Sequence, residues 1–83
     1  MTKSEFRKLL TKPKFRAWLE GKKPRVVVGV PHSITGCPIG RYVGGDWVDA
    51  HYGWHDEFAT EVDDSGFNII TAFRALKILD GIQ

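Results

Sequence analysis

The residue types best suited to nucleophilic chemistry lie together in residues 32–42, around the single cysteine, Cys37. Pro38 predicts the first turn of a helix, which would place Cys37 at a helix N-terminus, where the dipole favours a thiolate. His32 is close enough in sequence to act as a base. However, no third residue is apparent that would orient the histidine, and a small side chain packed under a loop explains the cysteine as well. We therefore expect no catalytic residue.

Histidine spacing raises the alternative of a metal site. His51 and His55 are four residues apart, and the further ligand types nearby are Cys37, His32, Asp49 and Asp56. Structural zinc usually takes two or more cysteines in Cys-x-x-Cys units, which this chain lacks. Gly53 also disfavours one helix that would hold both histidines on the same face. The sequence predicts no metal and no other cofactor.

An acidic turn in residues 63–74 has some features of a calcium-binding loop, with Asp63 and Ser65 at the first and third ligand positions. Arg74 then falls where a bidentate carboxylate is required, and a guanidinium cannot coordinate a cation. The segment is better interpreted as a helix end, a short extended piece and a new helix. Phosphate-binding and nucleophile-elbow motifs are absent from the sequence as well, so we expect a protein that is not an enzyme.

The charge distribution points to binding. The net charge is +2, but residues 1–25 hold nine basic and two acidic side chains, and residues 26–83 hold three and eight, which gives +7 and −5. Such asymmetry can steer an acidic partner. The alternative is a solvated helix face whose charge balances the acidic remainder of the chain. The candidate binding residues are Lys3, Arg7, Lys8, Lys12, Lys14, Arg16, Lys22, Lys23, Arg25, Arg41 and Trp47.

Two short helices must position this basic segment, residues 1–24. Apolar triplets at i, i+3, i+4 spacing predict a helix over residues 3–11 and a second one that starts at Pro13 and ends at Gly21. The two triplets are Phe6, Leu9, Leu10 and Phe15, Trp18, Leu19. Each presents a face that can dock on one core.

The remainder, residues 25–83, alternates between strand and helix signals. Val26, Val27 and Val28 predict a strand over residues 25–30, paired with a strand over residues 46–52. Short helices are expected from Pro38 to Gly44, around Phe58, and from an N-cap at Thr71. The apolar stripe of the last helix comprises Ala72, Ala75, Leu76 and Leu79, helped by Phe73 or Ile78. Residues 67–70 are expected to be extended.

The sequence therefore predicts a single α+β domain over residues 1–83, with four or five short helices packed on a small sheet of two to three strands. The 42% hydrophobic content supports a packed core. One cysteine fits a reducing compartment, and neither a secretory signal nor a run of apolar residues long enough to cross a membrane is evident. These observations lead us to expect a cytoplasmic protein.

Three segments together resemble a group of small uncharacterised proteins from bacteria and their phages. They are Phe-Arg-Ala-Trp-Leu-Glu at residues 15–20, Ser-Ile-Thr-Gly-Cys-Pro-Ile-Gly-Arg-Tyr-Val at residues 33–43 and Ile-Thr-Ala-Phe-Arg-Ala-Leu-Lys-Ile-Leu at residues 70–79. The most specific part is Cys-Pro-Ile-x-x-Tyr-Val. The resemblance implies no particular activity. By analogy alone, the small size suits a phage-borne inhibitor of a host nucleic-acid machine, of the anti-CRISPR kind.

We expect a small non-catalytic binding protein, a protein-interaction module or inhibitor that acts through a charged and aromatic surface on a protein or nucleoprotein partner. Three tryptophans in 83 residues favour this function. The alternative is nucleic-acid binding through the basic N-terminal helices. A Cys37-dependent enzyme is the weakest alternative.

Overall fold

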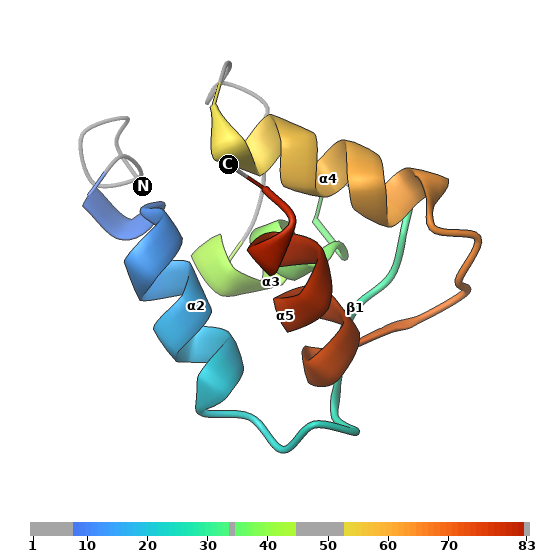
Figure 1. The fold of residues 1–83 in the computed structure, drawn as a ribbon, viewed down its shortest axis with the longest axis horizontal. Coiled ribbons are helices and arrows are strands. Elements are labelled where there is room, and N and C mark those ends of the chain that lie inside the picture. The colour runs from blue at the N-terminus through green and yellow to red at the C-terminus, as the bar shows by residue number, and fades with distance from the viewer. Residues whose placement is uncertain (1–7, 34, 45–52, 83) are drawn as a thin grey trace.

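The structure, a computed structural model, describes residues 8–33, 35–44 and 53–82. In these ranges the elements are α2 (Lys12–Glu20), β1 (Val27–Gly29), α3 (Pro38–Val43), α4 (Trp54–Asp64), β2 (Ile70–Thr71) and α5 (Ala72–Asp80). Helices α2 and α4 flank α5, while α3 lies behind it and β1 beside it in Figure 1. The predicted α+β class is confirmed. Within the described ranges, none of the helices combines the length and apolar character needed to span a bilayer.

Local signals define α2 well. Thr11 caps its N-terminus, because its Oγ1 accepts a hydrogen bond from Lys14 N at 3.3 Å. Pro13 lies in the first turn, where it is the second residue of the helix and not, as predicted, the first. Gly21 caps the C-terminus. Most of the helix predicted over residues 3–11 falls outside the described residues. In the part of this range that is described, Lys8 and Leu9 are helical.

The sheet pairs segments that the sequence had not paired. β1 lies antiparallel to β2, with Val27 opposite Thr71 and Gly29 opposite Ile70, and the register shifts between the two pairs. The strand predicted over residues 25–30 is thus present but shorter. Its proposed partner, residues 46–52, lies outside the described residues. The observed partner comes from the segment that was expected only to be extended, and the two strands fall within the predicted range.

The first turn of α5 is fixed by hydrogen bonds to three different acceptors. Ala72 N donates to Val26 O at 2.9 Å, Phe73 N donates to Pro24 O at 3.0 Å, and Arg74 N donates to Thr71 Oγ1 at 3.3 Å. A helix leaves its first four N–H groups without intrahelical partners. Three of them are satisfied here, so the start of α5 is tied to the chain before β1.

A close backbone approach joins β1 to α3. A Cβ on Gly29 would lie 2.4 Å from Pro38 N and 2.7 Å from Cys37 C, both of them backbone atoms. Only glycine allows this distance. At the other end of α3, Gly44 adopts the left-handed conformation with φ of 80° and ends the helix, as its position in the sequence predicts.

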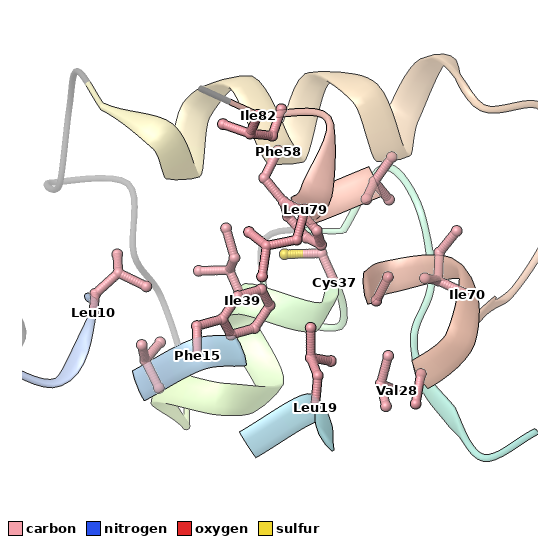
Figure 2. Close-up of a cluster of buried hydrophobic side chains, with 14 residues drawn as sticks. Leu10, Phe15, Leu19, Val28, Cys37, Ile39, Phe58, Ile70, Leu79 and Ile82 are labelled. Carbon is pink, nitrogen blue, oxygen red and sulfur yellow. The ribbon is translucent and has the colours of Figure 1, made fainter. Parts of the chain in front are cut away.

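The core is centred on Phe15, which is fully buried. Its ring contacts Trp18, Tyr42, Trp54 and Phe58, with ring centroids 5.2 to 5.9 Å apart, so that α2, α3 and α4 meet at one side chain. Leu19 and Leu79 extend the core between α2 and α5 (Figure 2). Aromatic contacts at these distances stabilise a core beyond the area they bury.

Replacing Gly29 with alanine tests the contact between β1 and α3. The added methyl group would collide with backbone atoms that cannot rotate away, so Gly29→Ala should lower the free energy of unfolding by about 1–3 kcal/mol. Urea unfolding followed by tryptophan fluorescence measures the change. Gly21→Ala is the matched control, because its Cβ would be 3.5 Å from the nearest atom and should have little effect. Equal stability of the two variants would contradict the predicted collision.

Candidate functional site

The basic side chains of α2 are largely used within the fold. Lys12 Nζ donates to the carbonyl oxygen of Ile82, and Lys14 Nζ donates to that of Lys8 at 2.8 Å. Arg16 forms ion pairs with Asp80 on α5 and, at 3.4 Å, with Glu20. The hydrogen bond and charge of Asp80 raise the pKa of Arg16 above its usual value. These three cations therefore help to hold α2 in place, which the charge count alone does not reveal.

The other predicted binding residues are more dispersed. Lys22 lies over the Trp18 ring, with Nζ 5.1 Å from the centroid. Lys23 and Arg25 are exposed in the turn before β1, and in the described part of the chain neither side chain has an ion-pair or hydrogen-bond partner. Arg41 is exposed on α3. The last three, Lys3, Arg7 and Trp47, lie outside the described residues.

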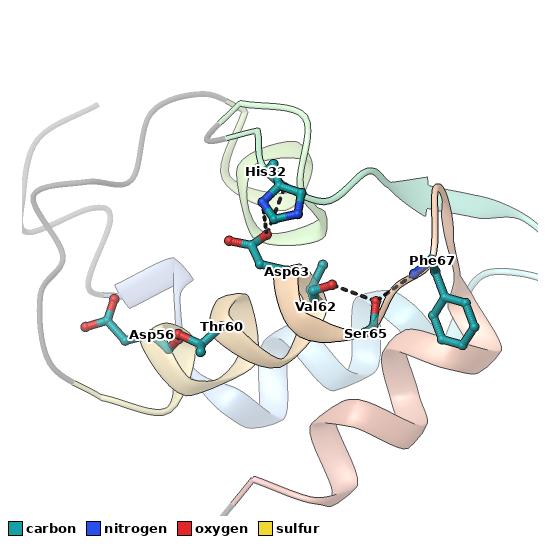
Figure 3. Close-up of polar contacts among 7 residues, drawn as sticks. All are labelled: His32, Asp56, Thr60, Val62, Asp63, Ser65 and Phe67. Carbon is teal, nitrogen blue, oxygen red and sulfur yellow. Dashed lines mark hydrogen bonds and ion pairs between the residues drawn. The ribbon is translucent and has the colours of Figure 1, made fainter.

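Cys37 is buried at the N-terminus of α3 and is its N-cap, since its Sγ accepts a hydrogen bond from Gly40 N at 3.3 Å. Its place before the helix was predicted correctly. His32 instead contacts Asp63: its backbone N–H donates to Oδ1 at 2.8 Å, and its Nδ1 lies 3.9 Å from the same oxygen (Figure 3). This arrangement supports a packing role for the thiol.

The metal hypotheses gain no support from the geometry. His55 is buried and makes an edge-on contact with the Trp54 ring at 5.8 Å, while His51 lies outside the described residues. In residues 8–33, 35–44 and 53–82, no three His, Cys, Asp or Glu side chains are grouped so that they could hold an ion. Ser65 Oγ donates to Val62 O at 2.6 Å and accepts from Phe67 N, the pattern of a helix end (Figure 3).

A groove of about 570 Å³ lies between α4 and the end of α5. Carboxylates of Asp56, Glu57 and Glu61 line one side, while Lys77 and two isoleucines line the other. No thiol or imidazole group reaches it from the described residues, so the groove offers no nucleophile or base of the kind considered above.

A more distinctive surface lies around the start of α5 and shares Lys77 with this groove. The described residues have five exposed large hydrophobic side chains, from Val27 at 37% exposure to Phe73 at 53%, and all of them come from residues 26–27, 67–69 and 73. The hydrogen bonds from α5 to Pro24 and Val26 bring these segments together, and in Figure 1 they lie beside β1 at the start of α5. The five are Val26, Val27, Phe67, Ile69 and Phe73.

A cation lies over each of the two phenylalanine rings among these apolar side chains. The Arg74 guanidinium lies 3.6 Å from the centroid of Phe67, and Lys77 Nζ lies 5.1 Å from that of Phe73. Residues 21–27 add three more basic residues, and neither this segment nor residues 66–77 contains a carboxylate. We call this surface the β1–α5 face. It comprises the five exposed apolar residues together with Lys22, Lys23, Arg25, Arg74 and Lys77.

Three of the ten residues of this face were predicted from the sequence. Lys22, Lys23 and Arg25 were among the candidate binding residues, but the five apolar members, Arg74 and Lys77 were not. The sequence left Phe73 and Ile78 as alternatives for the buried stripe of α5, and in the structure Ile78 packs against the core whereas Phe73 is exposed. Five cations without a carboxylate in residues 21–27 and 66–77 were the available signal.

The fold and this face define a small α+β domain with a basic and apolar surface. Comparison with known proteins found no matching family model, no matching curated protein and no matching solved structure.

The Cys37 thiol should react slowly in the folded protein. Its side chain is 5% exposed, so a mild alkylating reagent should leave most of the native chain unlabelled and should label it completely in urea. Intact-mass spectrometry gives the labelled fraction. Rapid, stoichiometric labelling of the native protein would contradict the packing role.

Tyr42 gives a spectroscopic test of the core. Its hydroxyl group donates to Leu9 O at 2.7 Å, and burial raises its pKa above the usual value of about 10. In a Tyr52→Phe variant, Tyr42 is the only tyrosine left, so its ultraviolet titration should have a midpoint above that of the urea-unfolded chain. The unfolded chain loses the Tyr42 hydroxyl proton at a lower pH than the folded chain does. The contribution of Tyr42 to stability should therefore be complete below about pH 10 and lost as pH rises through the folded pKa. Coincident midpoints would contradict the burial.

Proposed function

We propose that this chain is a non-catalytic protein-binding module, an inhibitor or adaptor that docks an acidic protein or nucleoprotein partner on the β1–α5 face. The observation that carries the proposal is that the exposed large hydrophobic side chains of the described residues all come from three segments, around β1, before β2 and at the start of α5, of which the first and last are joined by hydrogen bonds. Exposed apolar side chains scattered singly are ordinary, whereas a group bordered by charge is typical of an interaction site.

The composition of the face supports a protein partner. Aromatic and arginine side chains are enriched where protein interfaces gain most of their affinity, and this face has two phenylalanines and two arginines. Its formal charge comes from five cations, which favours acidic partners and speeds their association.

Nucleic-acid binding is the alternative, because the same cations could neutralise phosphates. Three observations disfavour it. Three of the five exposed apolar residues are aliphatic, and bases stack on aromatic rings. In addition, the Arg74 guanidinium already occupies one face of the Phe67 ring. Lys12, Lys14 and Arg16, three of the nine basic residues on which the nucleic-acid hypothesis rested, are also engaged within the fold.

Two variants of exposed residues test the apolar part of the face. Once a partner has been isolated from the source cell, its affinity should fall at least about tenfold for Ile69→Ser and for Phe73→Ser, as expected for interface hot spots. Both side chains are at least half exposed, so the fold should be retained. Phe73→Tyr keeps the ring and should bind nearly as well. Isothermal titration calorimetry with the purified partner measures each affinity.

A matched pair of charge reversals tests the electrostatic part. Arg25→Glu lies on the face and Lys14→Glu lies on α2, and both change the net charge equally. Only Arg25→Glu should substantially weaken binding of the partner. Equal effects of both variants would reject a localised docking face. Binding to DNA or RNA that falls steeply between about 50 and 200 mM salt and is lost in Arg25→Glu would instead favour the nucleic-acid alternative.

A further inference from the structure

We infer that the groove between α4 and the end of α5 is a second binding site, which takes a short segment of a partner protein that contains two arginines. The groove has the opposite charge to the β1–α5 face and shares only Lys77 with it. The inference therefore goes beyond the proposed function and does not depend on it.

The groove has the size of a ligand pocket and an apolar floor. Its volume is about 570 Å³, and all eight residues that line it belong to the described ranges. Pockets for small ligands have volumes of about 300–1,000 Å³. Ile78 is half-buried and Ile82 is buried, and together they form the apolar part of the lining. Such a floor can take the methylene groups of a long basic side chain.

Gly81 leaves space at the end of α5 without being required by the backbone. It caps the helix with φ of −81°, a conformation that any residue adopts. A Cβ at this position would lie 3.4 Å from Ile78 O, which is an ordinary contact distance. Since neither the backbone nor the packing requires glycine, what the missing side chain provides is room in the groove that Gly81 lines.

Two carboxylates of the groove wall have no cation of their own. Glu57 and Glu61 are exposed and one turn apart on α4, and neither has an ion-pair partner among the described residues. Lys77 lines the same groove, but its Nζ lies over the Phe73 ring, 5.1 Å from the centroid. The helix dipole explains an acidic residue in the first turn, such as Glu57, but not Glu61 further along. Like charges at this spacing repel, and a bound cation would remove the repulsion.

The chemistry of the groove favours arginine as the bound cation. Side chains at i, i+4 have Cβ atoms about 5–6 Å apart, so one guanidinium can donate to both Glu57 and Glu61. Its planar fork of donors matches carboxylates, while its stem covers apolar surface. With Asp56, three carboxylates and the ammonium group of Lys77 give the groove a formal charge of −2. Two arginines in one segment would neutralise it.

The probe that tests the site is the peptide acetyl-Leu-Arg-Arg-Leu-amide, titrated into the isotope-labelled full chain and followed by NMR. The amide signals of Glu57, Glu61 and Gly81 should shift as the peptide binds. A peptide with citrulline in place of both arginines has the same shape without the charge. It should bind at least about tenfold more weakly, because the charge-assisted hydrogen bonds are lost.

Matched variants locate the peptide. Gly81→Leu fills the groove and Glu61→Gln removes one charge, and each should weaken the peptide at least about fivefold. Gly21 is likewise a helix C-cap with ordinary φ, and Asp64 is likewise an exposed carboxylate of α4, but neither lines the groove. Gly21→Leu and Asp64→Asn should therefore leave the affinity unchanged. Circular dichroism checks that each variant is folded, and Glu61→Gln keeps the test decisive if Gly81→Leu is not.

Lys77 separates the two binding sites. Lys77→Gln removes a positive charge from the groove and should strengthen the arginine peptide, whereas it should weaken an acidic partner on the β1–α5 face. Ile69→Ser should weaken only that partner. Failure of the groove is thus distinguishable from failure of the β1–α5 face.

Three outcomes would overturn the inference. The site is rejected if the groove signals do not shift, or if Asp64→Asn weakens the peptide as much as Glu61→Gln does. Spermidine that binds as tightly as the peptide, with the same loss in Glu61→Gln, would assign the groove to a free polyamine. Dimerisation in ultracentrifugation that Glu61→Gln abolishes would assign it to a second copy of the chain.

Discussion

The arrangement of the whole sheet region depends on how the first turn of α5 satisfies its backbone N–H groups. Ala72 and Phe73 donate to carbonyl oxygens of residues that precede β1, and Arg74 donates to the Thr71 side chain. β1 and β2 have three and two residues, too few to form a stable sheet alone. The helix terminus needs acceptors and the strands need support, so one set of hydrogen bonds meets both requirements.

The same contacts divide the cations into two groups. On α2, Lys12 binds the carbonyl oxygen of Ile82 and Arg16 binds the carboxylate of Asp80, so these two cations help to pack α2 against the end of α5. Around β1 and along α5, cations lie over exposed rings or face solvent. The sequence does divide its charge unevenly. However, the cations that remain available for binding lie where the chain around β1 meets α5.

Sequence reasoning succeeded where the signal is local. Thr71, Pro38 and Gly21 were correctly assigned as helix starts and ends, because a cap depends on its immediate neighbours. It failed to pair β1 with β2, since a two-residue strand has no periodicity to detect. Whether Phe73 or Ile78 faces the core depends on the neighbouring helices, and the binding face depends on that choice. Cys37 was placed correctly, but its burial required the packing of α3 against Gly29.

The cations over the two exposed phenylalanines have a consequence for the behaviour of the unbound protein in solution. Arg74 and Lys77 cover part of the rings of Phe67 and Phe73 and keep similarly charged molecules apart. The apolar surface is thus shielded from its own copies while it remains reachable for an oppositely charged molecule. Loss of these two charges should make the folded protein prone to aggregate through this surface while every element of the fold is still intact.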